Sequence, residues 1–233
     1  MIRYDEQSVG RQGCNSACKS SVAPREAEWR ILSKPFDGVA TIRGAKEKSK
    51  SGYSEVTLDI SETRGITEVD LSRQTMVLTN PGPQRISSDP PVENVDAGPE
   101  TKIVIGNGQR NILKAGENGT EIYAGPGDSA VGNSGKDVFF YDLKNWANKS
   151  PSGDARQTDL YGFDRAEDKI VIATQNRDLC ERLKITKRDC GWSEVSLDED
   201  NDGRADFALL VNRHDLQKTD IQFQLPDHND FMM

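Results

Sequence analysis

The densest set of chemically useful side chains is the acidic segment DEDNDGRAD, residues 198–206. Its first three aspartates alternate, a glycine permits a sharp bend, and a fourth aspartate closes the segment. Alternating carboxylates on a tight loop converge on one point, and a hard cation such as Ca²⁺ takes about six to eight oxygen ligands. The predicted ligands are Asp198, Asp200, Asp202, Asp206 and the main-chain carbonyl of Arg204.

The segment is not an EF-hand. An EF-hand loop needs a bidentate glutamate at its twelfth position. Leu209 holds that position here, inside the apolar run FALLV. We therefore expect a calcium-binding loop between two β-strands, and the alternative is a solvated acidic hairpin without a metal.

Catalytic motifs are absent from the sequence. It contains no H-E-x-x-H pair, no G-x-S-x-G elbow and no Walker loop. Cys14 with Cys18 resembles half of a zinc site, but no second close pair completes it. We predict a protein without enzymatic activity.

Residues 106–140 nearly repeat every nine residues, as GNGQRNILK, AGENGTEIY, the eight-residue AGPGDSAV, and GNSGKDVFF. Each unit opens with small residues and carries an apolar residue near its end, namely Leu113, Ile122, Val131 and Phe139. A short fixed period is typical of a solenoid, in which each unit covers the apolar face of its neighbour. The fold class that we expect is all-β, with a right-handed parallel β-roll over residues 37–142.

The period resembles the glycine-rich nonapeptide repeat of RTX (haemolysin-type) proteins, which forms a calcium-binding parallel β-roll. That repeat has Asp at its sixth position, where this chain has Asn111, Thr120, Ser129 and Asp137. The resemblance therefore implies a roll that has lost most of its calcium ligands. Carboxylates remain at Asp137 and at Asp128, which lies one place early.

Residues 158–172, TDLYGFDRAEDKIVI, resemble the segment that follows the repeats in the C-terminal domain of serralysins. The resemblance implies a C-terminal β-rich cap over residues 143–233 and adds Asp168 to the predicted calcium ligands. The 198–206 loop also has a counterpart in that domain. The final residues, Asp230-Phe231-Met232-Met233, resemble the uncleaved signal that type I secretion machinery recognises.

Outside the repeats we expect an extended arm over residues 1–36, with a short helical turn near residues 26–32. Short alternating segments predict strands at residues 39–43, 54–61, 66–72 and 75–79. Residues 80–94 are rich in Pro and Ser and predict a loop. One short helix is expected within residues 175–184, and a strand at residues 193–197.

The formal charge of −8 argues against nucleic acid and anionic membranes as partners, because both require a basic surface. The opening residues contain no apolar signal segment, and no run reaches transmembrane length. Cys14 with Cys18 and Cys180 with Cys190 are either disulfides or reduced thiols, and disulfides would fit an extracellular protein.

These observations predict a secreted, non-catalytic RTX-type protein whose folding is coupled to extracellular calcium. An alternative is a module that binds carbohydrate or a cell surface, or an accessory module of an extracellular polysaccharide enzyme, which exposed stacking by Trp29, Trp146 or Trp192 would favour. A third hypothesis is a divergent enzyme with paired acids in a groove of the solenoid.

Overall fold

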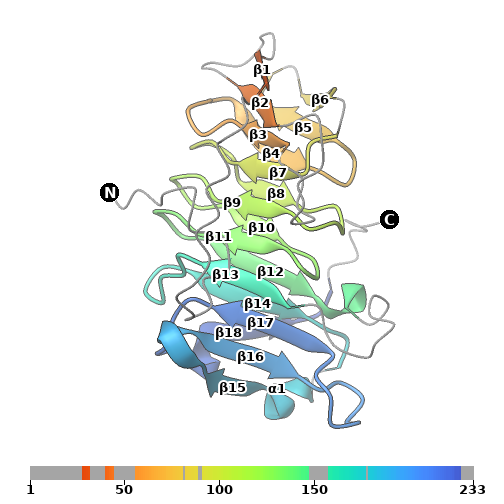
Figure 1. Ribbon diagram of the computed structural model, residues 1–233, viewed down its shortest axis with the longest axis vertical. Helices are drawn as coiled ribbons and strands as arrows, with labels where there is room; N and C mark the ends of the chain where they lie inside the picture. The colour runs from red at the N-terminus through yellow and green to blue at the C-terminus, as the bar shows by residue number, and fades with distance from the viewer. Residues whose placement is uncertain are drawn as a thin grey trace, which may run out of the picture.

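The computed structural model describes residues 28–31, 40–44, 56–80, 82–88, 91–146, 157–176 and 178–226. Within these residues the protein is built almost entirely from short β-strands, which confirms the predicted all-β class (Figure 1). The helical elements described are α1 (Leu179–Arg182), η1 (Leu143–Asn145), η2 (Asp189–Gly191) and η3 (Lys218–Asp220).

The strands form two mixed sheets. In spatial order, the ten-stranded sheet contains β1 (Glu28–Ile31), β2 (Thr41–Gly44), β3 (Thr57–Asp59), β7 (Asn94–Asp96), β9 (Ile112–Lys114), β11 (Ser129–Val131), β13 (Thr158–Tyr161), β17 (Phe207–Val211), β16 (Ser193–Leu197) and β15 (Lys184–Lys187). The eight-stranded sheet contains β18 (Ile221–Gln224), β14 (Lys169–Ala173), β12 (Val138–Asp142), β10 (Glu121–Tyr123), β8 (Ile103–Ile105), β4 (Ile66–Asp70), β5 (Thr75–Leu78) and β6 (Pro83–Arg85).

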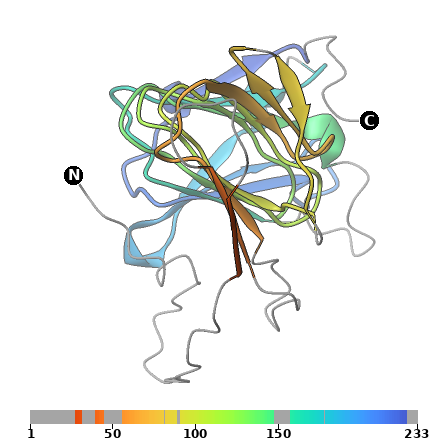
Figure 2. The same ribbon diagram turned by 90° about the horizontal axis from the view of Figure 1, so that it is seen from above.

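From β7 to β14 the chain alternates strand by strand between the two sheets. Within each sheet these strands pair in parallel. Two units of about nine residues therefore bring the chain back to the same sheet, as when Leu113 pairs with Val95 and with Ala130. Seen from above, these segments overlie one another (Figure 2).

The core lies between the sheets and is built from one inward side chain per short strand, because successive residues of a strand point to opposite faces. In the eight-stranded sheet the register aligns Val104, Ile122, Phe139 and Ile170. In the ten-stranded sheet it aligns Val95, Leu113, Ala130 and Leu160. All eight side chains are buried in one apolar cluster.

Val131 does not fill the core position that the sequence predicted for it. It aligns with Lys114 on the other face of the sheet, and Ala130 lies in the core instead. The cause is the eight-residue unit, which is one residue shorter and advances the strand by one position. A shift of one residue in a strand exchanges its two faces.

Two other local predictions were wrong. Glu28–Ile31 is a strand that pairs antiparallel with β2, where we expected a helical turn within the arm. Pro83–Arg85 is a strand within the predicted loop, and it pairs with β5. β6 ends the sheet order, where a proline is tolerated because one edge of the strand needs no ladder hydrogen bonds.

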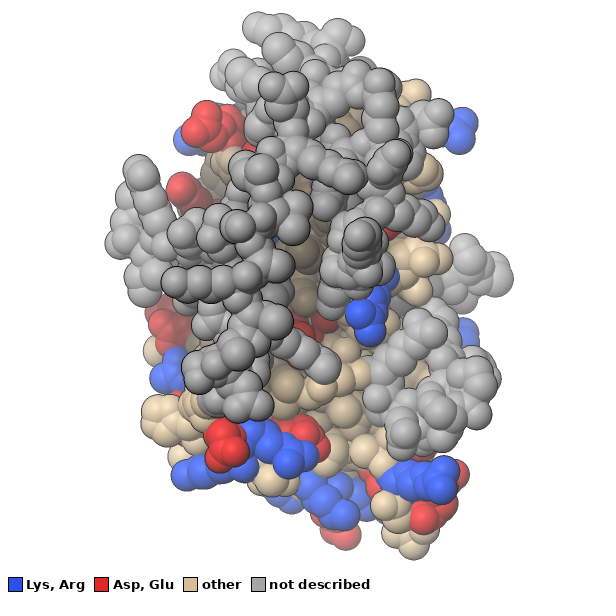
Figure 3. All heavy atoms as spheres, in the orientation of Figure 1, with Lys and Arg blue, Asp and Glu red and all other residues tan. Residues whose placement is uncertain are grey.

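The C-terminal part is closed by antiparallel strands. β15, β16 and β17 form successive antiparallel pairs, and β17 joins them to β13 in parallel. These strands lie at the lower end of the view in Figure 1, and there basic and acidic side chains lie side by side on the face that Figure 3 shows. Among the described residues, no helix has the length and apolar character needed to span a membrane.

Candidate metal site

The acidic loop connects β16 to β17, as predicted. The two strands pair antiparallel up to Leu197 and Phe207, which are opposite each other. Both strands alternate inward and outward residues, and these two side chains are buried in the core. The packed strand ends therefore hold the first and last residues of the loop close together.

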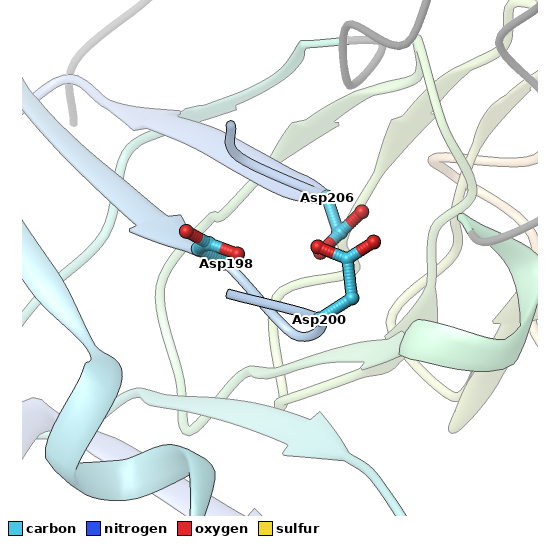
Figure 4. Close-up of side chains that lie close together, drawn as sticks. All are labelled: Asp198, Asp200 and Asp206. Carbon is cyan, nitrogen blue, oxygen red and sulfur yellow. The ribbon is translucent and has the colours of Figure 1, made fainter. Parts of the chain in front are cut away.

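Three of the predicted ligands converge in this loop. Asp198, Asp200 and Asp206 each offer a carboxylate oxygen, and these oxygens lie within 4.8 Å of one another (Figure 4). Calcium binds oxygens at about 2.3–2.6 Å, so two ligands of one ion lie up to about 5 Å apart. The spacing of the three oxygens thus fits a single calcium ion.

Backbone N–H groups orient the carboxylates. Gly203 N–H donates to Asp198 Oδ2 at 2.9 Å, and Glu199 N–H donates to Asp206 Oδ2 at 2.6 Å. The bend uses left-handed backbone conformations at Asn201 (φ 63°) and Gly203 (φ 87°). Glycine and asparagine tolerate this region better than other residues, so both suit the tight turn.

One oxygen of the site lacks a partner. Asp198 Oδ1 is buried and accepts no hydrogen bond from the described residues, although Asp198 as a residue is only partly buried. A buried carboxylate oxygen without a donor is costly, and an ion is one of the few explanations for it. Asp198 is also one of the three residues whose carboxylates converge.

Asp202 has a different position from the other three. Its carboxylate accepts the backbone N–H of Arg204 at 2.8 Å, and its own N–H donates to Asp200 Oδ1 at 3.0 Å. It is not a member of the converging group. Its role as a ligand, and that of the Arg204 carbonyl, stay predictions.

The loop is also tied to the neighbouring helix. Arg182 Nη1 donates to the carbonyl of Glu199 at 2.9 Å, which connects α1 to the loop. Burial raises the pKa of Glu199, and the nearby charges of Asp206 and Asp200 raise it further. The local environment is therefore one that a cation would stabilise.

The other three predicted ligands, Asp128, Asp137 and Asp168, lie elsewhere. Each is a buried residue directly before a strand, as are Asn111 and Thr120, and we call these five the corner residues. Asp128 is the counterpart of Asn111, because Ser129 pairs with Ile112. The sequence indicated this equivalence, because the eight-residue unit places Asp128 one position earlier than the other units place their corner residue.

The corner aspartates accept hydrogen bonds from the backbone on both sides. Asp137 Oδ2 accepts the N–H of Asn133 at 2.9 Å, and its Oδ1 accepts the N–H of Thr120 at 2.8 Å. Asp168 repeats the pattern with the N–H groups of Asp164 and Asp137. These bonds join each corner aspartate to the corner residue that precedes the neighbouring strand of the same sheet. The sequence did not indicate this structural role.

Two of the corner carboxylates, those of Asp137 and Asp168, have raised pKa values. Burial raises the pKa of Asp137, although hydrogen bonds from Asn133 and Thr120 oppose the shift. Burial also raises the pKa of Asp168 to about 6, again against two backbone hydrogen bonds. Calcium binding by Asp128, Asp137 and Asp168 stays a prediction, since among the described residues these three do not belong to a group of converging ligand atoms.

The aromatic side chains do not form one flat platform in the described part of the chain. Trp146 is buried against Tyr141 and Phe207. Trp192 meets Tyr161 edge to face, with an angle of 87° between the rings. The side chain of Trp29 lies outside the described residues, and carbohydrate binding stays a prediction.

The sequence left open whether the cysteines are disulfides or reduced thiols. Cys190 is disulfide-bonded, and Cys180 is exposed. Cys14 and Cys18 lie outside the described residues, as do the arm before Glu28 and the last four residues.

No protein-family model matches this chain, and no curated protein matches it. The likeness to RTX proteins and serralysins therefore rests on the motif residues quoted above.

Proposed function

We propose that this protein binds Ca²⁺ in the loop between β16 and β17, through Asp198, Asp200 and Asp206. The observation that carries the proposal is the convergence of three carboxylates within 4.8 Å of one another. The buried, unpartnered Asp198 Oδ1 supports it, since a bound cation would satisfy that oxygen.

The donor set favours calcium over other metals. All three donors are carboxylate oxygens, and zinc and copper sites usually include His or Cys ligands. Magnesium demands near-ideal octahedral geometry and keeps several waters, while calcium accepts irregular loops that add carbonyl ligands. The predicted carbonyl ligand from Arg204 would therefore suit the larger ion.

A bound ion would stabilise the end of the fold. Asp198 and Asp206 stand at the two ends of the loop, directly after β16 and directly before β17. Without a cation their charges repel each other and Asp200, which opposes closure of the hairpin. An ion that binds only the closed loop adds its binding free energy to folding.

We further propose a right-handed parallel β-roll of RTX type between β7 and β14. Alternation between two sheets and the spacing of about nine residues support this architecture. In this account the protein is non-catalytic, leaves the cell by type I secretion, and completes its folding outside where calcium is abundant. The last four residues are the proposed export signal.

Calorimetric titration tests the calcium site. Asp200→Asn and Asp206→Asn should each lower the stoichiometry by one ion, because each removes a charged ligand. Asp178→Asn is a matched control, since Asp178 is exposed and makes no capping hydrogen bond with its side chain. Unchanged stoichiometry in both loop variants would refute the site.

Asp202→Asn separates the two possible roles of Asp202. If this residue only holds the turn, as its bond to Arg204 N–H indicates, the variant should keep the full stoichiometry. Loss of the ion in this variant would make Asp202 a ligand and would change the proposed donor set.

A further inference from the structure

The strand β18 ends the eight-stranded sheet with an open edge. Among the described residues its pairing partner is β14 alone, and that pair is parallel. Gln224 turns its carbonyl toward β14, where it accepts the N–H of Thr174 at 2.9 Å. Main-chain groups of successive strand residues alternate between the two edges of a strand, so the N–H and C=O of Phe223 point away from β14. An open edge of this kind is a template for another strand.

The other three sheet edges carry residues that oppose the addition of a strand. Charged side chains and proline on an edge strand disfavour pairing with another chain. These residues are Glu28 and Arg30 in β1, Lys184 and Lys187 in β15, and Pro83 and Arg85 in β6. β18 has the sequence IQFQ, without charge or proline, and its two glutamines are exposed. β18 is therefore the sheet edge best suited to accept a strand.

The inner face of β18 continues the core toward the open edge. Ile221 is the register partner of the core residue Ile170, and Phe223 packs against the same core while it stays partly exposed. Leu225 follows in the same alternation. It is 50 % exposed, and it is the only exposed large apolar side chain in the part of the chain that the structure describes. An added strand would cover apolar surface as well as pair the backbone.

Residues 221–225, IQFQL, read nearly the same in both directions. In an antiparallel pair of two such strands with Phe223 opposite Phe223 of a second copy, each glutamine faces a glutamine and Ile221 faces Leu225. The two-fold axis of such a pair places no like charges opposite each other. The backbone groups of Phe223 face the open edge, so the two copies can exchange both hydrogen bonds at this residue.

We propose that two copies of this protein associate through β18, as antiparallel strands centred on Phe223. The partner is a second copy because a self-complementary strand suits a two-fold axis. The association joins two eight-stranded sheets into one and covers the exposed parts of Phe223 and Leu225. Five paired residues bury far less than the roughly 1,600 Å² of a standard interface, so we expect a weak dimer.

This inference goes beyond calcium binding and does not depend on it. None of the three converging aspartates of the 198–206 loop lies in β18. We therefore expect the same dimer with calcium and with chelator.

Sedimentation equilibrium from about 10 μM to about 1 mM protein tests the association, and two charge variants test the register. In Gln222→Lys/Gln224→Lys each lysine faces a lysine of the second copy, so the dimer should weaken at least about tenfold. In Gln222→Lys/Gln224→Glu each lysine faces a glutamate, so the dimer should be kept or tightened. Thr186→Lys is the control, since Thr186 is exposed on the edge strand β15, and it should leave the dimer unchanged.

Both double variants should unfold at the wild-type temperature when monomeric, since both glutamines are exposed. A wild-type protein that stays monomeric at about 1 mM would overturn the proposal and leave the edge to an extended strand of another protein. A dimer of unchanged strength in Gln222→Lys/Gln224→Lys would refute β18 as the interface. Equal weakening in the two double variants would refute the proposed register.

Discussion

At the scale of single residues, aspartates serve two purposes in this protein. In the corners, Asp137 and Asp168 use both carboxylate oxygens to accept backbone hydrogen bonds. In the loop, Asp198 keeps one buried oxygen without a partner. Since a carboxylate whose oxygens already accept hydrogen bonds has less to gain from a cation, we propose the loop, and not the corners, as the calcium site.

The sequence predicted the loop but not which of its aspartates converge. Three alternating aspartates and a fourth at the end were expected to converge, and three of these four do. Asp202 faces elsewhere because the left-handed conformations at Asn201 and Gly203 turn its carboxylate toward the N–H of Arg204. A pattern of residue types does not contain those backbone angles, so the difference required the structure.

The corner carboxylate of Asp168 predicts a specific dependence on pH. Its pKa is about 6 in the fold, above its ordinary value of 3.8, because burial penalises the charged form. The neutral form of this carboxyl tolerates burial, so the stability that it contributes is fully present below about pH 4. That stability is lost as the pH rises through about 6, because the buried group must then carry a charge. Chelator-treated Asp168→Asn should lack this loss.

The measurement is the free energy of unfolding in urea from pH 4 to pH 7. The wild-type protein should lose about 1–2 kcal/mol relative to Asp168→Asn across this window. Asp178→Asn, an exposed control, should follow the wild type. Parallel curves for wild type and Asp168→Asn would show that this carboxyl has no raised pKa.

At the scale of elements, the nine-residue period predicted where strands form but not their register. The eight-residue unit places Ala130 rather than Val131 in the core, and Asp128 in the corner. Both follow from one deleted position, which the spacing of apolar residues alone could not locate. The strands β1 and β6 were missed because pairing partners decided their conformation.

Close stacking of the turns predicts different outcomes for two similar glycines. A Cβ added to Gly116 would lie 2.0 Å from the carbonyl oxygen of Gly98, whereas one added to Gly125 meets only Asp128 Oδ2 at 3.6 Å. Gly116→Ala should therefore destabilise by about 2 kcal/mol or more, and Gly125→Ala by far less. Equal effects in thermal or urea unfolding would contradict the stacking.

An ion-pair cluster joins the turn after β13 to the turn before β18. Arg165 Nε contacts Asp220 Oδ2 at 2.7 Å, and the Asp220 side chain is only 9 % exposed. Arg165→Ala should lower the midpoint of urea unfolding, because a shielded carboxylate loses its cation. Arg64→Ala is the comparison and should have a smaller effect, since the pair of Arg64 and Glu100 is exposed to solvent.

At the scale of the whole molecule, most of the stability should survive without calcium. The stack from β7 to β14 is held by parallel ladders, an apolar core and hydrogen-bonded corners, none of which needs a metal. One ion at about 100 times its Kd contributes about 2.7 kcal/mol. For a domain of this size, that corresponds to about 5–10 °C in Tm.

Chelation should therefore lower Tm by about this amount in calorimetry and leave the far-ultraviolet circular dichroism spectrum at 25 °C unchanged. The Asp200→Asn variant, which lacks the proposed ion, should show little further loss on chelation. Complete unfolding by chelator at 25 °C would mean that calcium has a larger share in the fold than one loop site allows.

The most direct test of the central claim is a crystal structure grown with millimolar calcium, with anomalous diffraction data to identify the ion. We expect one calcium between Asp198, Asp200 and Asp206, with oxygens at about 2.3–2.6 Å and Asp198 Oδ1 among its ligands. An ordered loop with water or no density between these three carboxylates at that calcium concentration would contradict it.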